Sequence, residues 1–179
     1  MVNSLSNKEQ LFAAPIDEVP LAFIDLEMTG LDPAADHVIE ICIERVRAGV
    51  VVAALTSLVR PSARCVVDGG VHGLREQDLA TAPTFAQLTM RISSLLRGAV
   101  VVAHAVKHDI AFLQTEYQRA GQPFSPPVYV DTLAIARRTL ERPAYGLAAL
   151  AQHFDIENPK PHRAANDVSV TRALFAQLR

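Results

Sequence analysis

Hydrophobic and polar residues alternate along the first third of the chain, whereas apolar residues recur every three or four positions in much of the remainder. Alternation and short apolar runs bounded by turn residues both predict β-strands. The strands are expected over residues 21–27, 37–47, 50–59, 99–103 and 128–130. Turn residues between the first three strands indicate that these strands form an antiparallel meander.

The helical spacing predicts further elements after the third strand. Helices are expected over residues 84–98, 109–121, 133–140, 146–154 and 164–178. Strands that are first consecutive and then alternate with helices predict an α/β fold, a mixed five-stranded sheet in which helices flank an antiparallel meander plus parallel strands. We expect one domain over residues 21–179, preceded by a flexible leader over residues 1–20 in which Leu11 and Phe12 are candidates for docking.

The composition adds limits on function. The chain has 179 residues, half of them hydrophobic, which is enough for one substantial core. Its net charge of −2 provides no basic field for nucleic acid and, taken alone, favours a small-molecule enzyme. Cys42 and Cys65 have no CxxC spacing, which is typical of reduced structural thiols and argues against a zinc site.

No apolar run approaches the roughly 18 residues that a membrane span requires. The first residues also lack the basic start and apolar stretch of an export signal. We therefore expect a cytoplasmic protein that does not associate with membranes.

The strand expected over residues 21–27 ends in two carboxylates. Asp25 and Glu27 are two positions apart, so the period of a strand places them on one face. Neighbouring like charges at the end of an apolar strand either raise a pKa or bind a cation, for which a hard divalent ion is the natural partner. A solvated strand end explains this pair equally well when the pair is considered alone.

Two further carboxylates lie near the beginnings of expected helices. Asp109 follows the buried strand over residues 99–103, where an acid could equally stabilise the helix N-terminus through the macrodipole. Asp167 shares a helical stripe with apolar residues, so it points towards the core and requires a partner. His162 precedes this last helix, where a local hydrogen bond is the alternative explanation.

The segments that carry these residues are 23–30, 101–113 and 161–168. In this order they resemble the motifs of DEDDh (DnaQ-like) 3′–5′ exonucleases, a family that includes the epsilon subunit of bacterial DNA polymerase III, RNase T and oligoribonuclease. The resemblance covers the chain from about residue 21 onwards and implies an RNase H-like fold. It also implies a catalytic site in which four carboxylates hold two divalent metal ions, Mg²⁺ or Mn²⁺. Asp25, Glu27, Asp109 and Asp167 match the metal-binding positions, and His162 matches the residue that takes a proton from the attacking water.

The resemblance also implies contacts to the terminal nucleotide. A His-Gly-Leu segment followed by Ala-Pro-Thr-Phe at residues 82–85 is similar to the epsilon subunit. The candidate substrate-binding residues are Met28, Thr29, Gly30, Leu31, His72, His104 and Lys160. Lys107 and Arg163 are better interpreted as solvated surface charges.

The second motif departs from the family pattern His-Asn-Ala-x-Phe-Asp. Ala105 replaces the asparagine and His108 replaces the aromatic residue, while Asp109 is retained. We therefore expect an altered substrate preference or rate with the chemistry intact. The segment Asp-Leu-Glu-Met-Thr-Gly at residues 25–30 is more similar to oligoribonuclease, which leaves RNA open as a substrate.

The implied function is hydrolysis at the 3′ end of single-stranded DNA with release of nucleoside 5′-monophosphates. A 3′–5′ exoribonuclease acting on short or single-stranded RNA is one alternative. An inactive exonuclease-like module that binds nucleic acid or a polymerase is another, against which the five retained residues argue. The expected partners are nucleic-acid 3′ ends and, as a candidate, a DNA polymerase. Two bound divalent ions would supply the positive charge that the chain itself lacks. The sequence leaves open the oligomeric state, and whether the chain is a proofreading subunit or a free-standing enzyme.

Overall fold

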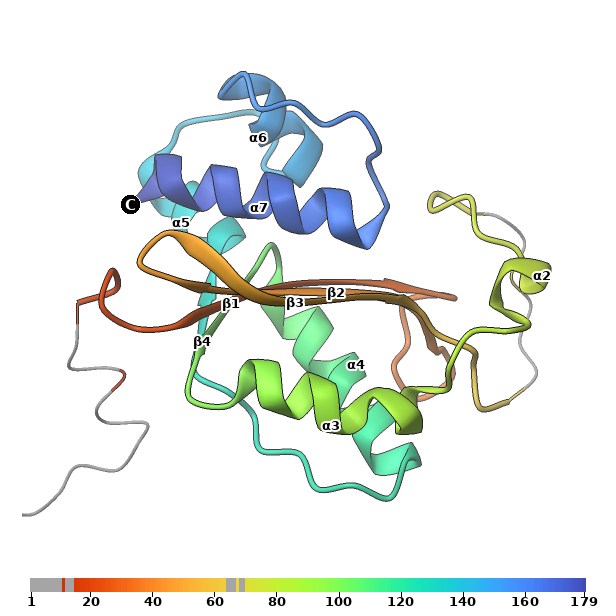
Figure 1. Ribbon diagram of the computed structural model, residues 1–179. Helices are drawn as coiled ribbons and strands as arrows, with labels where there is room; N and C mark the ends of the chain where they lie inside the picture. The colour runs from red at the N-terminus through yellow and green to blue at the C-terminus, as the bar shows by residue number, and fades with distance from the viewer. Residues whose placement is uncertain (1–10, 12–14, 64–66, 68–69) are drawn as a thin grey trace, which may run out of the picture.

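The computed structural model describes residue 11, residues 15–63, residue 67 and residues 70–179 (Figure 1). Its centre is a five-stranded sheet with the strand order β3-β2-β1-β4-β5. The strands are β1 (Leu21–Met28), β2 (Val38–Arg47), β3 (Val50–Leu58), β4 (Val100–Ala103) and β5 (Tyr129–Asp131). β1, β2 and β3 pair antiparallel, whereas β4 runs parallel to β1 and β5 runs parallel to β4. The predicted mixed sheet is therefore confirmed.

Helices cover both faces of this sheet (Figure 1). One face carries α3 (Phe85–Leu96) and α4 (Val106–Arg119). The other carries α5 (Thr132–Thr139), α6 (Leu147–His153) and α7 (Ala164–Leu178). In the part of the chain that the structure describes, no helix is both long and apolar enough to cross a membrane.

The alternation along β1 explains how the sheet is packed on both sides. Ile24 and Leu26 face the cluster formed with α3 and α4, whereas Phe23 faces the cluster formed with α7. Phe23 meets Phe175 of α7 edge to face, with 5.7 Å between the ring centroids. Burial of each such side chain contributes about 1.5–3 kcal/mol. Because side chains alternate along a strand, Asp25 lies on the same face of β1 as Phe23, which is the face towards α7.

Parallel pairing brings several strand ends to one edge of the sheet. Because β1, β4 and β5 run in the same direction, their carboxyl ends lie together, which is where α/β proteins commonly bind ligands. The turn after β4 places Ala105 in the left-handed conformation (φ 66°), and α4 begins at the next residue. Asp131, at the end of β5, caps α5 through Leu133 N–H and also accepts a hydrogen bond from Ala105 N–H, each at 3.0 Å.

Some predicted boundaries were wrong by a few residues, and one element was not predicted. α2 (Glu76–Leu79) is a single turn in which only Leu79 is buried, so it has no repeating apolar pattern to detect. α4 begins at Val106 rather than at residue 109, and β5 covers residues 129–131 rather than 128–130. The predicted start of α3 is confirmed, because Thr84 N–H donates to the Gln87 side chain at 2.8 Å.

The interpretation of the leader stays a prediction for most of its length. Residues 1–10 and 12–14, including Phe12, lie outside the described residues, as does Cys65. Leu11 packs against the apolar cluster between the sheet and α7. Cys42 is a buried free thiol, and burial raises its pKa to about 11, which keeps it protonated at neutral pH.

Candidate active site

Three acidic side chains meet at the carboxyl end of β1. Asp25 and Glu27 come from β1, and Asp167 comes from the first turn of α7. Each offers a carboxylate oxygen, and these oxygens all lie within 4.8 Å of one another. The predicted face of β1 and the predicted inward stripe of the last helix therefore meet at one point.

Asp109 completes this group from the opposite side of the sheet. It lies in the first turn of α4, is buried, and is close enough to Asp25 for its charge to raise the pKa of Asp25. The Asp109 carboxyl also accepts backbone hydrogen bonds, which involve its own amide and that of Leu26. The contact with Leu26 ties the N-terminus of α4 directly to β1. All four predicted carboxylates thus gather in one place.

Burial raises the pKa values of Asp25, Glu27 and Asp109. Burial raises the pKa of Asp25 well above its usual range, and the charges of Asp109, Glu27 and Asp167 raise it further. The pKa of Glu27 rises to about 7, first through burial and then through Asp167 and Glu40, while Arg163 opposes the shift. The pKa of Asp109 rises to about 8, mainly through burial, against the effect of its backbone hydrogen bonds.

This donor set fits a hard divalent cation. Each ligand is a carboxylate oxygen, the type that Mg²⁺ and Mn²⁺ prefer. The elevated pKa values arise first from burial and then from the charges of neighbouring acids, so the deprotonated carboxylates repel one another. A bound cation would remove this repulsion, so the residues present fit a divalent metal.

The entry to α7 brings His162 beside the carboxylates. Its backbone N–H donates to Asp167 Oδ2 at 3.0 Å, and its φ of 60° places it in the left-handed region. Asn166 Nδ2 donates to the other Asp167 oxygen at 3.0 Å, so the carboxylate of Asp167 is held from two sides. The His162 side chain is exposed, which leaves its ring accessible from solvent.

An ion pair to a buried acid fixes the start of α7, and the sequence interpretation missed it. Arg163 donates two hydrogen bonds to Glu40 of β2, at 3.0 and 2.8 Å, and Ala164 N–H donates to the same carboxylate at 3.1 Å. Glu40 is buried and pairs with Glu27 across the β1–β2 ladder. Arg163 is a partly exposed charge, with 42% of its side chain accessible, but its interpretation as a solvated surface charge missed the pairing with Glu40. A useful signal was present, because Glu40 stands in an otherwise apolar stretch of β2.

The end of β1 and the segment after it supply four of the predicted substrate-binding residues. Met28 packs against the core beneath α3 and α4, and Thr29 bonds to the Asp36 side chain at 3.0 Å. A Cβ added to Gly30 would lie 2.4 Å from Asp36 Oδ2, so only glycine fits here without displacing that carboxylate. Leu31, in contrast, is 82% exposed.

The other candidate contact residues have different surroundings. Both ring nitrogens of His104 bond within the chain, to Thr132 Oγ1 at 3.0 Å and to the Tyr145 carbonyl at 2.9 Å. Burial lowers the pKa of His104, although Asp131 and Asp167 lie close enough to oppose this shift. His72 Nδ1 accepts from Leu74 N–H at 3.0 Å. Lys160 is exposed in the loop before α7, and the exposure of Lys107 agrees with its interpretation as a surface charge. The substrate roles of His104, His72 and Lys160 stay predictions.

The altered second motif takes an unusual form. His108 packs edge to face against Phe112, with 5.0 Å between the ring centroids. Among the described side chains, its Nε2 is buried without a hydrogen-bond partner. The imidazole ring of His108 thus packs at the position where the family pattern has an aromatic residue. Asp109, which follows it, remains in the group of four carboxylates.

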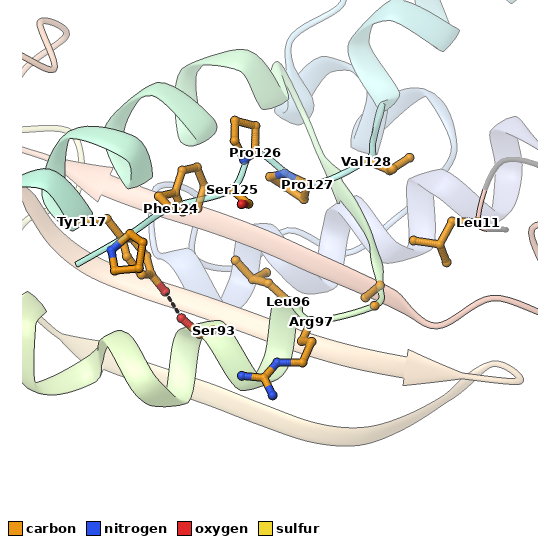
Figure 2. A pocket seen from close by; sticks show the side chains of 13 residues that line it. Leu11, Ser93, Leu96, Arg97, Tyr117, Phe124, Ser125, Pro126, Pro127 and Val128 are labelled. Atoms are coloured by element: carbon orange, nitrogen blue, oxygen red, sulfur yellow. Dashed lines mark hydrogen bonds between the residues drawn. The ribbon is translucent and has the colours of Figure 1, made fainter. Parts of the chain in front are cut away.

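A separate pocket of about 280 Å³ lies beside the proline-rich connector between α4 and β5 (Figure 2). Its wall includes Leu96, Phe124 and Tyr117, whose hydroxyl forms a 2.7 Å hydrogen bond with Ser93. None of the four carboxylates lines it. This pocket is therefore distinct from the acidic site.

The site geometry agrees with a family assignment. The exonuclease family profile RNase_T matches residues 22–175, which include every carboxylate of the site. The chain belongs to this exonuclease family.

Relatives of this exonuclease chain include replication proteins. Over 167 residues it is 30% identical to DNA polymerase III subunit epsilon of Treponema pallidum, covering 90% of this chain and 77% of that protein. It is 31% identical over 174 residues to a DNA polymerase III subunit epsilon-like protein of Rhodobacter capsulatus, covering 94% and 25%. It is 26% identical over 166 residues to a PolC-type DNA polymerase III of Thermotoga petrophila, covering 92% and 12%. The exonuclease chain thus spans a quarter or less of the length of the last two relatives.

Solved structures have the same fold as this exonuclease chain. E. coli exonuclease I in complex with a dT13 oligonucleotide matches with a TM-score of 0.77 at 18% identity, covering 89% of this chain and 41% of that one. The nuclease domain of 3′hExo, a DEDDh family member bound to rAMP, matches with a TM-score of 0.78 at 14% identity, covering 92% and 94%. At these identities the likeness concerns the fold, and it agrees with the RNase H-like architecture.

Proposed function

We propose that this chain is a divalent-metal-dependent 3′–5′ exonuclease that removes nucleoside 5′-monophosphates from single-stranded DNA. The observation that carries this proposal is the meeting of Asp25, Glu27 and Asp167 within 4.8 Å, with Asp109 beside them, in a buried position. Replication relatives of epsilon type support DNA as the substrate. The direction of hydrolysis follows the relative named 3′-5′ exonuclease DinG.

Each site residue has a distinct role in this proposal. Asp25, Glu27, Asp109 and Asp167 hold two divalent cations, Mg²⁺ or Mn²⁺. These ions, when bound, supply the Lewis acidity that activates water and neutralises charge developing on the phosphate. His162 accepts the proton of the attacking water and, because its ring is exposed, passes it to solvent. Asn166 and the His162 amide keep the Asp167 carboxylate in one orientation throughout.

The last residue of β1 and the segment after it receive the end of the nucleic acid. These residues follow Glu27 directly, so a 3′-terminal nucleotide held here has its scissile phosphate beside the carboxylates. The exposed Leu31 side chain offers an apolar surface to the terminal base or sugar. Met28, Thr29 and Gly30 contribute backbone contacts, and Lys160 and His72 contact the strand further out.

A 3′–5′ exoribonuclease is the second candidate. The oligoribonuclease-like segment at residues 25–30 favours it, as does the fold similarity to 3′hExo. DNA and RNA oligomers of the same sequence would separate the two functions, because the 2′-OH is the group that a site can use to distinguish them. For the DNA function we propose a DNA polymerase as a partner and the cytoplasm as the location, on the strength of the epsilon relatives.

A single-stranded oligonucleotide with a 5′ fluorophore tests the proposal. With Mg²⁺ or Mn²⁺ we expect a ladder that shortens one nucleotide at a time from the 3′ end, with mononucleotides as products and complete inhibition by EDTA. Asp167→Asn serves as the inactive control. Absence of metal-dependent shortening, or release of the fluorophore on the first product, would refute the proposed activity.

A further inference from the structure

The loop over residues 29–36, which follows β1, is closed by hydrogen bonds at its two ends. Thr29 N–H donates to the His37 carbonyl at 3.0 Å, and His37 N–H donates to Thr29 Oγ1 at 3.0 Å. The Asp36 carboxylate forms hydrogen bonds within the loop, accepting from Thr29 Oγ1 at 3.0 Å and from Asp32 N–H at 2.9 Å. Local contacts alone therefore define where this loop starts and ends.

A distant arginine holds the remainder of the loop. Arg119, in the last turn of α4, donates from one guanidinium nitrogen to the Asp36 carbonyl at 2.7 Å. Its second nitrogen donates to the carbonyls of Pro33 at 3.0 Å and Ala34 at 2.9 Å. Three loop carbonyls thus bind a single planar group, which fixes their relative orientation.

A buried acid orients that arginine. Glu116 is buried one turn earlier on α4, and its Oε1 accepts from Arg119 at 2.8 Å and lies 3.2 Å from His37 Nδ1. Because a guanidinium is planar with donors in fixed directions, Glu116 sets the direction in which the other nitrogens point. The same contact compensates its charge. Lysine has one donor centre and cannot reproduce this arrangement.

We propose that Arg119 is a positioning residue that holds the 29–36 loop in the conformation that receives the 3′-terminal nucleotide. The proposal rests on the proposed function. The loop displays the exposed Leu31 shortly after the strand that carries Asp25 and Glu27, while Arg119 lies in the last turn of α4, at the opposite end of this helix from Asp109. A loop that is already ordered loses less conformational entropy when substrate binds, so Arg119 contributes to affinity without touching the substrate.

Replacement of Arg119 should separate binding from chemistry. For Arg119→Met and Arg119→Lys we expect KM for a single-stranded oligonucleotide to rise about tenfold while kcat stays within about twofold, the pattern of lost ground-state binding. Arg45→Met is the matched control, because Arg45 also clamps backbone carbonyls, those of Leu95 at 2.6 Å and Arg97 at 2.9 Å. Those carbonyls lie at the end of α3 rather than in the loop, so its KM should remain that of the wild type.

Hydrogen exchange provides a readout that does not depend on activity. The amides of Ala35 and Asp36, which bond to the Asp32 carbonyl, should exchange faster in Arg119→Met than in the wild type or in Arg45→Met. Unchanged exchange in this loop, or a KM change no larger than that of Arg45→Met, would overturn the positioning role.

Failure of the proposed function would be recognised separately. If the wild type does not hydrolyse oligonucleotides, the proposed function fails. Fluorescence anisotropy with Ca²⁺ in place of Mg²⁺ then measures the dissociation constant of the same oligonucleotide without turnover. A rise of about tenfold for Arg119→Met, but not for Arg45→Met, supports the positioning role, and equal constants or no binding by the wild type contradict it.

Discussion

For individual carboxylates of the acidic site, burial opposes the ionisation that metal binding requires. Asp25 sits near the end of an apolar strand, where burial and four neighbouring acids raise its pKa. Such a residue destabilises the metal-free fold, while in the proposed function it provides a metal ligand. The protein therefore carries electrostatic strain at the residues proposed to bind metal, a pattern common at functional sites.

Replacing Asp25 should separate stability from activity. In Asp25→Asn the repelling charge disappears while the side chain keeps its shape, so thermal unfolding in EDTA should occur at the wild-type temperature or above. Hydrolysis should fall at least about a thousandfold, because one metal ligand is lost. Exposed Glu141→Gln is the control for loss of one negative charge and should leave both measurements unchanged. A variant that unfolds markedly earlier would argue against repulsion at this site.

Gly30 is a second residue whose identity is set by its neighbours. In Gly30→Ala the new methyl would lie 2.4 Å from Asp36 Oδ2, so the Asp36 carboxylate must give up bonds to Thr29 or Asp32. We expect KM to rise about five- to tenfold with kcat little changed, as for other losses of binding. Gly146→Ala is the matched control, because its added Cβ meets nothing within 4 Å. Equal KM values for the two variants would contradict this role of the loop.

At the scale of elements, the start of α7 decides the geometry of the site. This helix delivers Asp167 in its first turn, and residues 158–163 approach it through a loop that contains the left-handed His162. Glu40 of β2 anchors this entry by accepting from Arg163 and from the backbone N–H of Ala164. Glu40 on β2, the strand beside β1, thus positions helix α7, which carries Asp167.

Breaking this anchor should reduce both turnover and stability. Glu40→Gln weakens the paired bonds to Arg163, and we expect a loss of about 2 kcal/mol in unfolding free energy and about tenfold in kcat. Glu44→Gln is the matched control, since Glu44 joins the same strand to Arg172 of the same helix at 2.9 Å. The Glu44 side chain is 21% exposed against 3% for Glu40, so the loss of its pair should cost within about 1 kcal/mol and leave kcat unchanged. Comparable kcat values for the two variants would show that α7 does not depend on Glu40 for its position.

At the scale of the whole molecule, the raised pKa values link folding to pH and to metal. Glu27 and Asp109 bind protons more tightly in the folded chain, with pKa values of about 7 and about 8 against ordinary values of 4.5 and 3.8. Their contribution to stability is therefore complete below the ordinary values and is lost as pH rises through the folded ones. A divalent cation binds the deprotonated forms, so its effect has the opposite sign.

Thermal unfolding across this window tests the linkage. In EDTA we expect Tm to fall as pH rises from about 5 to about 8. Saturating Mg²⁺ or Mn²⁺ should raise Tm, and this rise should be larger at about pH 8 than at about pH 6. The Asp25→Asn variant should show a smaller dependence on both. A metal-free Tm that increases through this range would contradict the raised pKa values.

Much of the fold could be predicted because it depends on short-range periodicity. The alternation in β2 and the helical stripe of α7 are set by neighbouring residues, so their positions and their buried faces follow from the sequence. The boundaries of α4 and β5 could not be predicted as well, because the left-handed turn at Ala105 and the pairing with β4 decide them. α2 was not predicted, because a single buried leucine gives no helical periodicity of apolar residues.

The sequence by itself determined which residues could carry the chemistry. It placed Asp25 and Glu27 on one face of a strand through the period of two, and it put Asp109 and Asp167 near helix starts. Only the tertiary structure decided the partners of these elements. Glu40 and Arg163 are 123 positions apart, and Arg119 lies 86 positions from Pro33, so no local pattern connects them. These contacts depend on how the helices dock on the sheet, which is set by the packing of the whole core.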